Sequence, residues 1–169
     1  MSTPALSAEH QALLAHLTAQ RQHVLGILEG LDEEALRRPV LPSGWSCLGL
    51  LRHLALDDER FWFQAVLAGD PDAIAAVTGN PADAWQVGPE TSAESVFALY
   101  REQAGRTDAL LAATSLDTPP AWWPDFFSGW RFDNAREVVL HVITETAVHA
   151  GHLDAARELI DGRTWLVLS

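Results

Sequence analysis

The segment between residues 141 and 152 carries the side chains best suited to chemistry, namely His141, Glu145, His149 and His152. On an α-helix, at about 100° per residue, these four fall within an arc of about 80°. On the predicted helix of about residues 134–162, apolar residues share this side, whereas the charged residues lie on the opposite side, namely Arg136, Glu137, Asp154 and Glu158. Burying an unpaired carboxylate is costly, so Glu145 needs a strong partner on that face. A divalent cation is one such partner, and the i, i+4 spacing of Glu145 and His149 lets both reach the same ion.

A third ligand is expected from another segment. His53 is the one histidine of residues 46–69, and it lies beside Leu50, Leu54 and Phe61 on an apolar face. Arg60 and Gln64 are expected to continue the same stripe. Two imidazoles and a carboxylate are ordinary ligands of Zn²⁺ and its neighbours, and three protein ligands leave positions open for catalysis. The pattern also fits hydrogen-bonded histidines in a polar core, so spacing alone leaves both interpretations open.

Four long helical patterns position these residues. They span about residues 7–30, 46–69, from Thr91 or Ser92 to about residue 111, and 134–162. Thr91 with Glu94 has capping-box spacing, and Asn134 begins the last pattern while Gly162 ends it. Short turns are expected near residues 32–35, and residues 70–90 read as a loop with room for one short helix. The chain is therefore predicted to be all-α, a four-helix bundle in one domain spanning residues 1–169.

Residues 119–132 join the third and fourth patterns and are unusually aromatic, with six of fourteen positions being Trp or Phe. Two interpretations carry equal weight. The segment can plug one end of the bundle, or it can form a wall of a ligand pocket, since pockets are often lined by aromatic side chains.

Composition excludes several classes of function. The formal net charge is −12, and all 11 basic residues are Arg. An acidic surface repels phosphates, so we expect neither nucleic acid nor an anionic membrane as a partner. The lack of Lys removes Schiff-base chemistry and the P-loop lysine. A single cysteine, Cys47, and the lack of a signal peptide or an apolar membrane span favour a cytoplasmic protein, with Cys47 a small core residue.

Residues 44–54 with 59–63, and residues 141–154 with 157–162, carry a family resemblance that extends over about residues 5–165. The sequence resembles the DinB-like metal-binding superfamily, in the branch related to mycothiol-dependent maleylpyruvate isomerase; the most specific part is the pattern Glu-x3-His-x-Gly-His-x-Asp. The resemblance implies an up-up-down-down four-helix bundle with one divalent metal between its second and fourth helices. The implied ligands are His53, Glu145 and His149.

The same resemblance implies roles for neighbouring residues. His152 and His141 become residues that face the substrate or support a ligand, and we take His152 as the catalytic candidate. Asp57 is a candidate to orient His53. Asp57, Arg60 and His141 are the candidates for cofactor binding.

The function implied by the resemblance is that of a metal-dependent thiol S-transferase in detoxification or stress defence. A low-molecular-weight thiol such as mycothiol would attack a small electrophile, and since Cys47 is the only cysteine the sulfur would come from that cofactor. Zn²⁺ suits the ligands, with Ni²⁺ or Fe²⁺ as alternatives. Two other functions stay open: a non-catalytic, metal-stabilised bundle that binds a small molecule or forms a homodimer, and a metal-dependent hydrolase.

Overall fold

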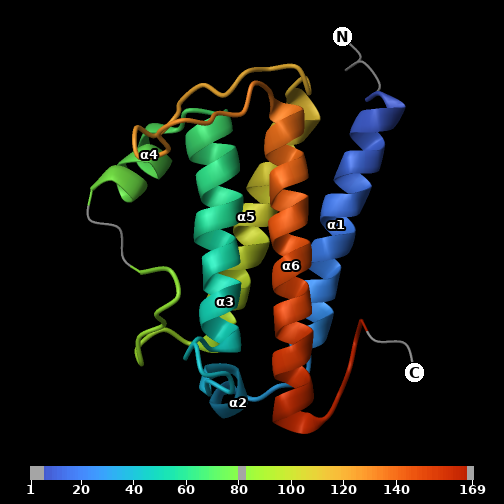
Figure 1. The fold of residues 1–169 in the computed structure, drawn as a ribbon, viewed down its shortest axis with the longest axis vertical. Helices are drawn as coiled ribbons and strands as arrows, with labels where there is room; N and C mark the ends of the chain where they lie inside the picture. The colour runs from blue at the N-terminus through green and yellow to red at the C-terminus, as the bar shows by residue number, and fades with distance from the viewer. Residues whose placement is uncertain (1–5, 80–82, 167–169) are drawn as a thin grey trace.

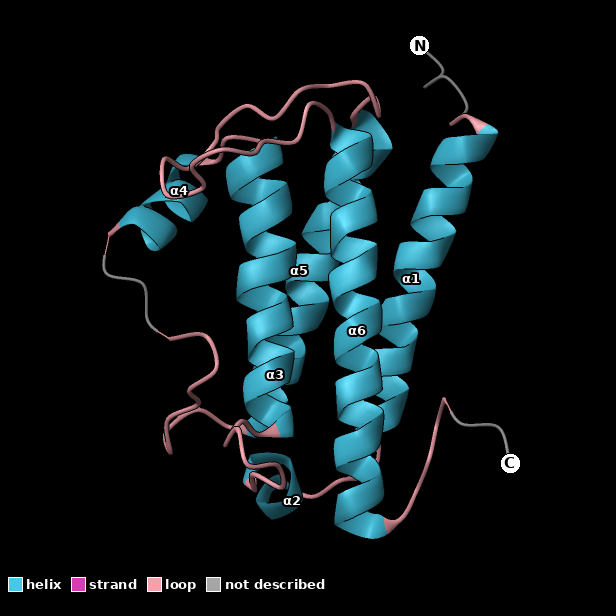
Figure 2. Ribbon diagram, in the orientation of Figure 1, coloured by secondary structure: helices cyan, strands magenta, loops and turns pink. Residues whose placement is uncertain are grey.

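In the computed structural model, all regular structure within residues 6–79 and 83–166, the part of the chain that it describes, is helical (Figure 2). Four long rods form the bundle: α1, α3 continued by η1, α5 and α6. Two short helices, α2 and α4, flank it. The elements in chain order are α1 (Ala8–Leu28), α2 (Glu33–Arg37), α3 (Cys47–His53), η1 (Leu54–Leu67), α4 (Pro71–Thr78), α5 (Ala93–Ala113) and α6 (Ala135–Asp161). The all-α expectation is confirmed.

The helix directions differ from those that the resemblance implied. Arg136 near the start of α6 pairs with Glu9 near the start of α1, with Nε 2.6 Å from Oε1. Near the end of α6, Arg157 donates a 2.6 Å hydrogen bond to the carbonyl of Ile27 near the end of α1. These helices therefore run the same way, while α3–η1 and α5 both run the opposite way (Figure 1).

The order is therefore up-down-down-up, and the expected up-up-down-down order is wrong. The connections explain the difference. Residues 29–46, with α2, join α1 and α3 at one end of the bundle, whereas α4 lies near the opposite end, beside the end of η1, and α5 begins back at the first end (Figure 1). The long crossover thus lies between the second and third rods.

Helix ends largely follow the sequence signals. Asn134 caps α6 by accepting a hydrogen bond from the backbone N–H of Glu137, and Gly162 ends the helix at φ 78°. Ser46 caps α3 in the same way. The start of α5 is the exception, because Ser92 caps it through Ser95 N–H and the expected capping box of Thr91 with Glu94 does not form.

The second rod changes its winding at His53. From Leu54 onward η1 is a π-helix, in which each N–H bonds five residues back rather than four, and the rod still runs unbroken from α3 (Figure 1). Residues five apart therefore come close to sharing a face. Gln64 shows the consequence: it turns into the bundle and donates a 3.0 Å hydrogen bond to Gln103 of α5, instead of continuing the stripe of His53.

A buried ion pair links three rods at mid-height. The Arg21 guanidinium of α1 binds Glu59 of η1 through two bonds of 2.6 and 2.8 Å, and also reaches Asp108 of α5 at 2.6 Å. The Arg21 and Glu59 side chains are only 7% and 1% exposed. A fully desolvated pair of this kind is sensitive to the loss of either partner, because the survivor stays buried with an unpaired charge.

Replacing Arg21 with Met should therefore destabilise the fold by about 3–5 kcal/mol, measured by urea unfolding. The matched control is Arg106→Met on α5, which removes an exposed i, i+4 pair with Glu102 and should cost under about 0.5 kcal/mol. Equal effects of the two substitutions would show that the buried pair does not hold the rods together.

Candidate functional site

His53 lies at the junction of α3 and η1 with its ring held on two sides. Its Nδ1 is 2.8 Å from Oδ2 of Asp57, one turn further along the rod. The indole of Trp85, from the loop before α5, stacks on the ring with centroids 4.2 Å apart and planes 20° apart. A carboxylate on Nδ1 favours the tautomer that leaves Nε2 free to bind a metal ion or a hydrogen-bond donor.

His149 and Glu145 of α6 face this histidine across the bundle. The ring centroids of His149 and His53 are 5.0 Å apart, and Nε2 of His149 lies 3.8 Å from Oε2 of Glu145. Burial, together with the nearby His53 and His152, lowers the pKa of His149 to about 4. The imidazole is therefore neutral at neutral pH, which is the form that can bind a metal ion.

Asp58 lines the cavity described below and is a candidate that sequence reasoning missed. Its side chain is buried beside Glu145, and within the described part of the chain Oδ2 has no hydrogen-bond partner. Desolvation raises the pKa of Asp58 well above its ordinary value, and the carboxylates of Glu145, Glu59 and Asp57 raise it further. On an α-helical wheel Asp58 lies far from the face of His53. The π-helical winding of η1 turns Asp58 toward the cavity side of the rod, and no residue pattern indicated that winding.

The donor set at this point fits a divalent cation in its chemistry. Two imidazoles and a carboxylate come from two rods, and the orphaned Asp58 oxygen beside Glu145 marks a place where a cation would relieve buried negative charge. As they stand, however, no three His, Cys, Asp or Glu side chains of residues 6–79 and 83–166 are arranged to hold an ion.

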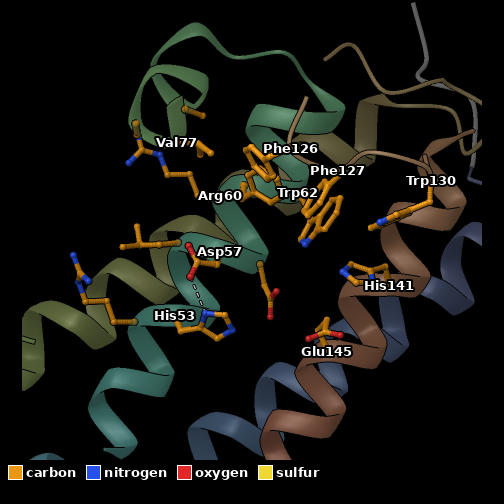
Figure 3. Close-up of a pocket in the computed structure, with 16 residues that line it drawn as sticks. His53, Asp57, Arg60, Trp62, Val77, Phe126, Phe127, Trp130, His141 and Glu145 are labelled. Atoms are coloured by element: carbon orange, nitrogen blue, oxygen red, sulfur yellow. Dashed lines mark hydrogen bonds and ion pairs between the residues drawn. The ribbon is translucent and has the colours of Figure 1, made fainter. Parts of the chain in front are cut away.

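A cavity of about 810 Å³ opens beside these residues. His53 and Asp57 reach it from the second rod, and Glu145 and His141 from α6, while Phe126 and Phe127 of the aromatic segment stand further along it (Figure 3). This volume is typical of small-molecule sites. His141 packs edge-on against Trp62 with centroids 4.6 Å apart, and burial lowers its pKa.

The remaining candidates occupy different positions. Arg60 lines the cavity and also donates to the backbone carbonyl of Asp72 at 3.3 Å. His152 is exposed and does not line the cavity; its Nδ1 is 3.4 Å from Nδ1 of His149. His152 therefore contacts the Nδ1 side of the His149 ring and does not border the cavity in which a substrate would lie.

The profile of one protein family, described as mycothiol-S-transferase, matches residues 12–162. The chain belongs to this family. Membership places it among DinB-like proteins, as the resemblance implied, and the matched range includes all four rods except the first four residues of α1. A comparison with curated proteins finds no significant match. None of the helices in the described residues is long and apolar enough to cross a membrane.

The mycothiol-S-transferase family is named for an external thiol. The environment of Cys47 agrees with a reaction in which the sulfur does not come from the chain itself. Its side chain is buried at the start of α3, and burial raises the pKa of the thiol to about 11. A thiol that stays protonated and covered is a poor nucleophile.

Cys47 should accordingly resist iodoacetamide in the folded protein at about pH 8 and react once urea unfolds the chain. Mass spectrometry of the alkylated protein measures this directly. Alkylation at the same rate in the presence and absence of urea would show that Cys47 is accessible and competes with an external thiol.

Gly49 determines how closely Trp85 can approach His53. A Cβ at Gly49 would clash with the carbonyl oxygen of Trp85, so only glycine lets this loop lie against α3. Gly49→Ala should push the loop away and destabilise the protein by about 1–3 kcal/mol in urea unfolding. Gly105→Ala on α5, where a Cβ meets nothing within 4 Å, is the control and should stabilise by about 0.5–1 kcal/mol. A Gly49→Ala protein as stable as wild type would refute the tight approach.

Proposed function

We propose that this chain is a metal-dependent S-transferase that activates mycothiol or a similar low-molecular-weight thiol for attack on a small electrophile in detoxification or stress defence. One observation carries the proposal. In a mycothiol-S-transferase family member, the rings of His53 and His149 come from two helical rods and lie 5.0 Å apart, and His149 lies 3.8 Å from Glu145. His53 and Glu145 also line a small-molecule cavity. His53, Glu145 and His149 would hold one divalent cation, with Zn²⁺ the best match to the ligands and Ni²⁺ or Fe²⁺ as alternatives.

A bound cation would favour the thiolate form of the cofactor at neutral pH, which is the nucleophilic form. Residues of the chain would orient the metal ligands. Asp57 fixes the His53 ring through Nδ1, and Trp85 covers its face. Asp58 adds a buried carboxyl group whose Oδ2 has no hydrogen-bond partner within the described residues.

Other cavity residues would bind and orient the ligands. Arg60 would accept an anionic group, and His141 would contact the ligand from the α6 side. His152 would act through His149, because it contacts that ring and lies outside the cavity. We therefore propose His152 as a positioning residue, in place of the catalytic role expected from the sequence.

Metal content tests the ligand assignment. The untagged protein should contain about one divalent ion per chain by elemental analysis, and His149→Ala should lose it, because removing one of three ligands sharply weakens binding. His16→Ala is the control: His16 is exposed on α1, away from the cavity, and its removal should leave the metal content unchanged. Full metal occupancy in the His149→Ala protein would contradict the assignment.

Turnover tests the function. The protein with mycothiol and chlorodinitrobenzene should form the thioether faster than the uncatalysed reaction, and a chelator should abolish the excess rate. Metal-dependent melting without turnover for any thiol and electrophile would instead establish a non-catalytic, metal-stabilised bundle. Ester cleavage without added thiol would establish a hydrolase.

A further inference from the structure

The cavity has two chemically different walls. His53, Asp57, Asp58 and Glu145 are grouped where α3–η1 faces α6. Apart from Arg52, Arg60 and His141, the rest of the cavity wall is apolar. It comes from the second half of η1, the short helix α4 and the segment between α5 and α6. Its aromatic members are Phe61, Trp62, Phe126, Phe127 and Trp130.

The aromatic segment is anchored so that its rings stay at this wall. The backbone N–H groups of Ala121 and Trp122 donate to the carbonyls of Leu67 and Val66 at the end of η1, at 3.2 and 3.1 Å. Phe127 stacks on Trp62 with planes 3° apart and centroids 5.6 Å apart. These contacts plug the end of the bundle, so the plug interpretation of the segment holds.

Two rings of the segment pack against the edge of this plug and still keep much of their surface exposed. Phe126 is 61% exposed and Trp130 is 45% exposed, although both line the cavity. Phe126 lies nearly parallel to Phe61 at a centroid distance of 6.4 Å. Large aromatic side chains that remain exposed at the mouth of a cavity are typical of a ligand-binding surface. The second interpretation of the segment, a pocket wall, therefore holds as well.

We infer that the electrophile modified at this site carries a flat apolar body, such as an aromatic ring system, which Phe126 and Trp130 hold against the apolar wall while its reactive carbon points toward the imidazoles. The inference rests on the proposed function. A polar thiol fits the wall of ionisable groups and leaves the aromatic wall for the second substrate. The binding of aromatic rings by aromatic side chains is favourable through area burial and stacking.

The step itself is a nucleophilic substitution. The thiol gives up its proton to solvent, the sulfur forms a bond to the electrophilic carbon, and the leaving group departs with the electron pair of the bond that breaks. The aromatic wall takes no part in bond making. It raises the local concentration of the electrophile and orients it, which is expressed in KM for apolar substrates.

The test compares two electrophiles that share the reactive carbon and leaving group: iodoacetamide and N-(naphthylmethyl)iodoacetamide, each with mycothiol and the protein as purified. The enzymatic kcat/KM, divided by the spontaneous rate constant, should be at least about tenfold higher for the naphthyl compound. Phe126→Ala should raise KM for the naphthyl compound by about three- to tenfold, and so lower the ratio of the two normalised rate constants by about the same factor. Because Cys47 is buried, it does not consume either reagent.

The matched control is Leu159→Ala, which removes an apolar side chain that is 60% exposed near the end of α6 and outside the cavity. It should change neither reaction. A binding measurement that needs neither thiol nor turnover accompanies the kinetics: the neutral fluorescent probe N-phenylnaphthylamine should bind the wild-type and Leu159→Ala proteins about equally and bind Phe126→Ala several-fold more weakly.

Equal normalised rates for the two electrophiles, with no effect of Phe126→Ala on the probe, would overturn the inference while leaving the transferase function in place. Absence of thiol transfer to either electrophile would overturn the proposed function, and with it the assignment of the aromatic wall to an electrophile. Probe binding would then report only an apolar cavity.

Discussion

Three successive carboxylates on one helical rod set the electrostatic problem that the structure has to solve. Asp57, Asp58 and Glu59 follow one another on η1, and Glu145 of α6 adds a fourth acid nearby. Glu59 is neutralised inside the bundle by Arg21, and Asp57 is paired with His53. Asp58 is left buried with an unpaired oxygen in the described structure. A cation held next to Glu145 would compensate the excess of buried acidic groups. The proposed metal would therefore stabilise the fold as well as take part in the chemistry.

The π-helical winding of η1 determines the direction in which each of these three carboxylates points. In an α-helix the three would point in directions about 100° apart, and Asp58 would lie far from His53. With hydrogen bonds to the fifth residue back, the rod directs Glu59 to Arg21 while Asp58 lines the cavity. This local winding accounts for the main errors of the sequence analysis at the site: Asp58 was missed, and Gln64 was expected on the face of His53 although it bonds to Gln103 in the interior.

Much of the rest was predictable, because it depends on local signals. Capping by Ser46 and Asn134 and the left-handed Gly162 follow from residue type, and the face of α6 follows from its periodicity. That periodicity is why Glu145 and His149 could be expected to meet His53. The helix order and the stacking of Trp85 on His53 were not predictable, since both depend on where a long connection crosses the bundle. For the aromatic segment the sequence offered two interpretations, and the fold satisfies both: Phe127 packs on Trp62 in the plug, and Phe126, Phe127 and Trp130 line the cavity.

The account depends most on the claim that the site binds its thiol as the thiolate at neutral pH. Titrating mycothiol into the protein by calorimetry, in two buffers with different ionisation enthalpies, measures the protons released on binding. The metal-loaded protein should release about one proton per thiol bound at about pH 7, and the chelator-treated protein should release none. Binding of mycothiol to the metal-loaded protein without proton release would contradict the account, because the thiol would then be held in its unreactive form.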